Sequence, residues 1–111
     1  MSVKDIRPKA VPIQLDKQRH LLYDMNAFCE IEDKLGGIQQ AFDILKNASP
    51  KGIRTLLWAG LVHEDEELTE KQVGAMFGLG SLEKISTAIS EAIVGSLPEP
   101  KNDDPSPAKK K

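Results

Sequence analysis

The chain of 111 residues has few of the residue types that most often carry chemistry. It has one cysteine, Cys29, so no disulfide can form within the chain. A single thiol inside an apolar helical pattern predicts a small buried side chain in a reducing compartment. The two histidines, His20 and His63, form no site-like cluster with each other or with Cys29, so we expect no metal site.

Long apolar runs are also missing from the chain. No eighteen consecutive residues are apolar, and the first residues lack an apolar run of the signal-peptide type. We therefore expect no membrane span, no signal peptide and no membrane partner. The sequence predicts a soluble cytoplasmic protein.

Catalytic pairs are equally scarce. Glu30, Glu32 and Asp33 have the spacing of a solvated helix face, and residues 64–67 are typical of an exposed acidic loop. The glycine pair in residues 78–80 does not follow a strand, so it does not match a phosphate-binding loop. We expect no enzymatic activity, no catalytic residue and no cofactor.

Charge is unevenly distributed along a chain whose net charge is −2. Residues 24–67 carry four Lys or Arg and nine Asp or Glu, so the central region is acidic. Proteins that bind nucleic acid usually present a basic patch that displaces counterions from phosphates. This charge pattern argues against nucleic acid as a partner and accommodates a basic partner segment better.

Apolar spacing predicts a predominantly helical α+β fold. Residues 11–15 alternate between apolar and polar types, and residues 18–23 are expected to return as the second strand of a hairpin after a turn at Asp16-Lys17. Pro12 lacks a backbone N–H and confines the first strand to an edge. Two strands are marginal alone, so the hairpin must pack on helices.

Five short helices are predicted by apolar residues three or four positions apart, at about residues 25–35, 38–47, 50–62, 70–77 and 82–97. Asp24, Ser49, Thr69 and Ser81 suit the N-cap positions of four of them. Gly78 is expected to end the fourth helix. Together these patterns predict a single domain that spans residues 11–97.

The two ends of the chain have a different composition. Residues 1–10 are polar and basic, which predicts a flexible N-terminus. Residues 98–111 combine four prolines with Lys, Asp, Asn and Ser and contain no large apolar residue. This composition is typical of a disordered tail.

The third helix has more apolar surface than one stripe requires, which predicts a central position. We expect part of that surplus to lie in an exposed groove that receives a partner segment, since aromatic anchors dominate such interfaces. Core packing is the competing interpretation for Trp58, the only tryptophan. The candidate partner-binding residues are Leu56, Leu57, Trp58, Leu61, Phe28 and Phe77.

A helix-turn-helix is an alternative interpretation of residues 68–93, where a first helix, a glycine turn and a capped second helix follow one another. The second helix would present Ser81, Glu83, Lys84, Ser86 and Thr87. It has no arginine to pair with guanine and no basic neighbours to hold phosphates. A small DNA-binding regulator is therefore the weaker hypothesis.

Several stretches carry a resemblance to a known family. They are Leu-Tyr-Asp-Met-Asn-Ala-Phe-Cys-Glu-Ile-Glu at residues 22–32, Gly36-Gly37, Arg-Thr-Leu-Leu-Trp-Ala-Gly-Leu at residues 54–61, Leu68-Thr69 and Val73-Gly74. Together they resemble the small tail assembly chaperones of long-tailed bacteriophages and gene transfer agents. The resemblance covers roughly residues 11–97.

The resemblance implies a non-enzymatic chaperone that binds the tape measure protein in the host cytoplasm, keeps it soluble and assists tail tube assembly. It also implies two further partners, the tail tube protein and a longer form of the chain made by translational frameshifting. Such a chaperone is not expected in the mature virion. A structural tail or head-to-tail protein that stays in the virion is the remaining alternative.

Overall fold

The computed structural model describes residues 8–97 and confirms the α+β fold, with one hairpin and five α-helices. The expected flexible N-terminus lies mostly outside these residues, and the expected tail, residues 98–111, lies wholly outside them. The elements in chain order are β1 (Val11–Gln14), β2 (Gln18–Leu21), α1 (Met25–Leu35), α2 (Ile38–Asn47), α3 (Pro50–Leu61), α4 (Glu70–Gly74), the 3₁₀ helix η1 (Leu79–Ser81) and α5 (Leu82–Ser96).

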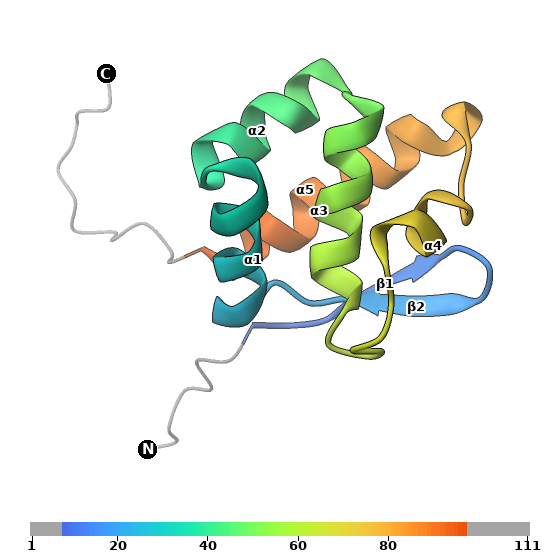
Figure 1. The fold of residues 1–111 in the computed structure, drawn as a ribbon, viewed down its shortest axis with the longest axis horizontal. Helices are drawn as coiled ribbons and strands as arrows, with labels where there is room; N and C mark the ends of the chain where they lie inside the picture. The colour runs from blue at the N-terminus through green and yellow to red at the C-terminus, as the bar shows by residue number, and fades with distance from the viewer. Residues whose placement is uncertain (1–7, 98–111) are drawn as a thin grey trace, which may run out of the picture.

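Helix α3 forms the centre of the fold. It contacts α1, α2, α4, α5 and β2, and Figure 1 shows these elements arranged around it, with α5 behind and the hairpin below. Because neighbours cover it on every side, α3 buries eight of its twelve residues. The predicted central position of this helix is confirmed.

The hairpin is antiparallel and pairs Val11 with Leu21 and Ile13 with Arg19. Its strands contact α3 and α5, and the buried side chains of Ile13 and Leu21 join the core. The turn is fixed by Asp16, whose carboxylate accepts hydrogen bonds from the Lys17 backbone N–H at 2.9 Å and from the Arg19 guanidinium at 2.8 and 3.0 Å. The sequence predicted both strands and this turn.

Three helix starts are set by the predicted caps. The Asp24 carboxylate accepts from the Ala27 N–H, and the Ser49 hydroxyl accepts from the Gly52 N–H. Thr69 and Gln72 form a complete capping box at α4, each side chain accepting from the other residue's N–H. Three expected caps therefore act as predicted.

One predicted boundary and one predicted cap bond are wrong, although α5 begins at Leu82 with Ser81 at its N-cap position as expected. Helix α4 ends at Gly74 and not near Gly78, because the Met76 N–H bonds the Val73 carbonyl three residues back and tightens the last turn. Ser81 makes no side-chain cap bond. It instead closes η1, whose backbone runs directly into α5 and supplies the first turn.

The hairpin exit approaches α3 closely at Gly60. The Leu22 N–H donates to the Gly60 carbonyl at 2.9 Å, and the buried Tyr23 hydroxyl donates to the Leu56 carbonyl at 2.6 Å. A Cβ at position 60 would lie 2.7 Å from the Tyr23 ring. Only glycine fits here, so this contact fixes how the hairpin packs on α3.

Candidate partner-binding surface

Three of the six candidate partner-binding residues lie in the core. The side chains of Leu56, Leu57 and Leu61 are 0% exposed. The expectation that they line an exposed groove is therefore wrong. The apolar surplus of α3 is explained by packing, because five other elements cover this helix.

Trp58 is partly buried, and its polar atom is used inside the fold. The indole N–H donates to the Leu68 carbonyl at 2.8 Å. The Lys34 ammonium lies 5.1 Å from the centre of the Trp58 ring and 3.6 Å from a Glu70 carboxylate oxygen. Trp58 thus holds the loop after α3 by a hydrogen bond, and a cation lies over its ring. A contact between Trp58 and a partner stays a prediction.

Phe28 and Phe77 are half-buried and line two separate hollows. Phe28 lies in the hollow that we call the α1 pocket, of about 370 Å³. The α1 pocket is lined by Met25, Phe28, Cys29, Glu32, Gly37, Ile38, Ser96 and Leu97. It joins the start of α2 to the last residues of α5.

Phe77 lies in a second hollow, which we call the η1 cleft, of about 560 Å³. The η1 cleft is lined by Pro50, Lys51, Arg54, Lys71, Gly74, Phe77, Gly78, Leu79 and Leu82. Leu79 projects from η1 with 77% of its surface exposed. One wall of the cleft is therefore apolar and the other is basic.

A third and larger hollow, of about 800 Å³, lies between α2 and α5. This α2–α5 groove is lined by Phe42, Leu45, Lys46, Ala48, Leu79, Leu82, Glu83, Ser86, Thr87, Ser90 and Glu91. It shares Leu79 and Leu82 with the η1 cleft, so the two hollows are adjacent.

The α1 pocket continues the same surface at the other end. On α2, Ile38 lines the pocket and Phe42, one helical turn later, lines the groove. On α5, Val94 follows Ser90 of the groove by four residues and precedes Leu97 of the pocket by three. We call the whole surface, from the η1 cleft through the α2–α5 groove to the α1 pocket, the seam.

The seam collects the large apolar side chains that the described part of the chain leaves in solvent. These are Leu79 at one end, Val94 between groove and pocket, and Met25 at the other end, exposed by 77%, 54% and 75%. Large exposed apolar side chains gathered on one face are typical of interaction surfaces, whereas single scattered ones are ordinary. The candidate site is therefore the seam and not α3.

Sequence reasoning missed these three residues for a physical reason. Met25 has the apolar spacing of the core side of α1, but it is the first residue of that helix and its side chain is exposed. Val94 stands off the buried stripe of α5, and Leu79 is flanked by two glycines. For Leu79, the available signal was an isolated large apolar residue between glycines.

Cys29 was predicted to be buried. It is instead exposed at the α1 pocket.

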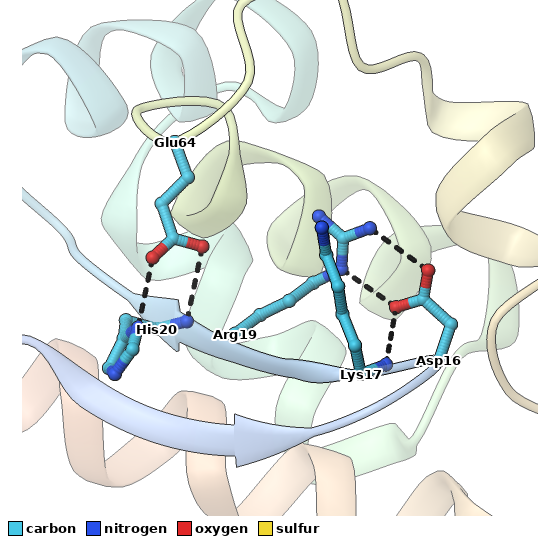
Figure 2. A network of polar contacts seen from close by, with 5 residues as sticks. All are labelled: Asp16, Lys17, Arg19, His20 and Glu64. Carbon is cyan, nitrogen blue, oxygen red and sulfur yellow. Dashed lines mark hydrogen bonds and ion pairs between the residues drawn. The ribbon is translucent and has the colours of Figure 1, made fainter.

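The acidic loop after α3 holds the hairpin (Figure 2). A Glu64 carboxylate oxygen lies 2.9 Å from His20 Nδ1, and the other accepts from the His20 N–H at 3.3 Å. His63 donates to the His20 carbonyl oxygen at 2.8 Å. Burial raises the pKa of Glu64, but the hydrogen bonds from His20 outweigh it and leave this pKa below its ordinary value. These histidines serve as structural links.

Residues 8–97 hold no group of three or more His, Cys, Asp or Glu side chains placed to share a metal ion. Within the same residues, no helix has the length and apolarity needed to cross a membrane. The chain matches no protein-family model, no curated protein and no solved structure with which it was compared.

Proposed function

We propose that the chain is a tail assembly chaperone that holds an amphipathic helical segment of the tape measure protein in the seam. The observation that carries this proposal is the placement of Leu79 and Met25 in neighbouring hollows at the two ends of α5, with the exposed Val94 on α5 between them. The sequence resemblance supplies the identity of the client. The surface supplies the mode of binding.

The dimensions of the seam suit a helix. Helix α5 has fifteen residues, which at a rise of about 1.5 Å per residue gives about 22 Å. A client helix of about four turns would lie along this length, with apolar residues three or four positions apart facing Leu79, Leu82 and Val94. The seam is open along its length, which favours reversible binding and later release of the client.

The polar rim of the groove limits how tightly the seam can hold a client. Glu83, Glu91 and Lys46 lie beside the apolar floor, and Ser86 presents a buried hydroxyl without a hydrogen-bond partner in residues 8–97. Such a mixed surface suits a chaperone, which must recognise its client and then leave it.

In this proposal the chain acts in the host cytoplasm before the tail is complete. It keeps the tape measure protein soluble, assists the addition of tail tube subunits and is absent from the mature virion. A frameshifted longer form of the chain would carry the same seam together with an added segment. Glu66 and Glu67 of the acidic loop are exposed at the opposite end of α3 from the η1 cleft and stay available to a basic client region.

Co-expression with the tape measure protein tests the proposal. We expect the chain to raise the soluble fraction of that protein and to co-purify with it in high salt, because apolar contacts persist when charges are screened. Unchanged client solubility without co-purification would contradict the chaperone function. Binding to duplex DNA that weakens steeply with salt would instead support the regulator alternative. Recovery of the chain from purified virions would support the structural alternative.

A further inference from the structure

The η1 cleft gathers three cationic side chains on a chain whose net charge is negative. Lys51 and Arg54 come from the first turns of α3, and Lys71 comes from α4. Lys51 and Lys71 are exposed, whereas Arg54 is partly buried. Because the lining contains no Asp or Glu, this end of the seam has one sign of charge.

The three cations of the cleft form no ion pair within residues 8–97, and Lys17, Lys46 and Lys84 form none either. Arg19 pairs with Asp16, and Lys34 pairs with Glu70. Glu70 is the nearest carboxylate in sequence to Lys71, but it is held by Lys34 and by the Thr55 hydroxyl at 2.6 Å. The positive charge of the cleft is therefore not neutralised by the described residues.

Arg54 adds a second observation. Its Nε is shielded from solvent and has no hydrogen-bond partner in residues 8–97. The aliphatic part of the same side chain packs against Gly74, where a Cβ would lie 2.9 Å from Arg54 Cδ. The terminal N–H groups of this guanidinium form a fork that can donate to a carboxylate in the cleft, whereas the shielded Nε cannot reach a ligand. The N-terminus of α3, a helix of twelve residues, adds partial positive charge nearby.

The opposite wall of the cleft is apolar and leads into the groove. Phe77, Leu79 and Leu82 line it, and Leu79 and Leu82 continue into the α2–α5 groove. A ligand with carboxylates alone would leave this wall in water. A ligand with apolar side chains alone would bury the three cations without a counter-charge, which is costly.

We propose that the η1 cleft binds the acidic end of an amphipathic helix, whose apolar residues continue along the groove while one or two carboxylates meet Lys51, Arg54 and Lys71. This inference rests on the proposed function for the identity of the partner, and it adds the charge and the direction of the segment that binds. The helix macrodipole favours its C-terminal end at the cationic cleft. The carboxylates of this occupant complement the charge of the cations, and its apolar residues match the apolar wall.

Other occupants explain fewer of these features. The chain's own residues 98–111 include Glu99, Asp103 and Asp104 but no large apolar side chain, so they do not match the wall formed by Phe77 and Leu79. Duplex DNA would meet the cations but would leave the same wall without a contact. Both remain outcomes that the test separates.

The test uses the full-length chain and two fluorescein-labelled synthetic helical peptides of equal length. They share the same apolar residues at positions i, i+3, i+4 and i+7, and they carry either Glu or Lys at their C-terminal ends. We expect fluorescence anisotropy to show tighter binding of the Glu peptide. Lys51→Glu with Lys71→Glu should weaken that binding about tenfold, since two exposed ion pairs are together worth about this factor.

Lys9→Glu with Lys84→Glu is the matched control, because it makes the same change in net charge with exposed residues outside the η1 cleft. It should leave the affinity for the Glu peptide within about twofold. Equal effects of the two double variants, or equal affinity for both peptides, would overturn the proposal. Tighter binding of a labelled DNA duplex than of the Glu peptide would also overturn it.

A variant with Glu99→Gln, Asp103→Asn and Asp104→Asn tests the chain's own C-terminal residues as the occupant. We expect its affinity for the Glu peptide to equal that of the wild type, and a clear rise would overturn the proposal.

Co-expression keeps this inference separate from the proposed function. If Lys51→Glu with Lys71→Glu binds the Glu peptide as tightly as the wild type and still solubilises the tape measure protein, the cleft assignment fails while the chaperone function stands. If wild-type chain binds the Glu peptide but never solubilises that protein, the function fails while the cleft assignment stands.

Discussion

The ammonium of Lys34 lies 5.1 Å from the centre of the Trp58 ring, so a cation from α1 covers the partly buried face of the only tryptophan in the chain. The same ring donates its N–H to the Leu68 carbonyl at 2.8 Å. These contacts join α1, α3 and the loop before α4. Trp58 is thereby engaged in the structure of the domain.

Replacing Trp58 with Phe should therefore lower the free energy of unfolding and leave the affinity for a partner nearly unchanged. The variant loses the hydrogen bond to Leu68 and part of the ring surface, at a cost of about 1–3 kcal/mol in the free energy of unfolding. Urea unfolding followed by circular dichroism measures this cost. Lys34→Gln, which removes only the cation, should cost less than about 1 kcal/mol. Loss of client binding by Trp58→Phe at unchanged stability would show that Trp58 is an anchor after all.

Gly60 and Gly95 form a matched pair of helical glycines with opposite expectations. In Gly60→Ala the new Cβ would lie 2.7 Å from Tyr23, which is held by its bond to Leu56, so we expect a loss of about 1–3 kcal/mol. At Gly95 no atom lies within 4 Å of the added Cβ, so Gly95→Ala should be neutral or stabilise by up to about 1 kcal/mol. Equal unfolding midpoints for the two variants would contradict the close approach at Gly60.

The turn of the hairpin gives a pH-dependent prediction. The hydrogen bond from Arg19 lowers the pKa of Asp16 from 3.8 to about 2. A lowered folded-state pKa stabilises the fold above pH 3.8, and this contribution is lost as pH falls toward about 2. Asp16→Asn should thus be less stable than the wild type at neutral pH, and the difference should shrink across that acidic range.

Chemical unfolding of both proteins at neutral pH and at several acidic pH values checks this prediction. Asp43→Asn is the control, since Asp43 is exposed and forms no ion pair within residues 8–97. A stability difference between wild type and Asp16→Asn that stays constant down to the acid limit would show that the Arg19 contact does not stabilise the turn.

Cys29 offers a test of the far end of the seam without any substitution. It is the only cysteine and is exposed at the α1 pocket. Bound client should slow its alkylation by N-ethylmaleimide, as measured by intact mass, because the client would cover the pocket. Unchanged alkylation in a stable complex would limit the client to the groove and the η1 cleft.

Much of the fold could be predicted because its signals are local. Asp24, Ser49 and Thr69 each supply a side-chain acceptor one turn before the donor that needs it, and all three act as caps in the structure. The alternation of apolar and polar residues over 11–15 predicted the first strand, and Asp16-Lys17 predicted the turn. The end of α4 was predicted too late, because the apolar spacing of Val73, Met76 and Phe77 continues past Gly74, where the Met76 N–H already bonds the Val73 carbonyl.

The partner surface was harder to predict because exposure is a tertiary property. Leu57 and Val94 are both apolar helix residues, yet one is 0% and the other 54% exposed, since neighbours cover α3 on all sides and α5 on only part of its surface. The spacing of apolar residues within one helix does not indicate how many other elements will pack against it. The seam also joins residues from α1, α2, η1 and α5, which meet only after folding.

Solubility of the tape measure protein co-expressed with Leu79→Ser and Val94→Ser combined would test the seam most directly. Both residues are exposed, so the variant should fold with a stability close to that of the wild type. Gln14→Ser with Lys84→Ser, two exposed positions outside the seam, is the control. We expect the soluble fraction of the tape measure protein to fall with the seam variant and to be retained with the control. A folded seam variant that keeps this protein as soluble as the wild type does would contradict binding through the seam.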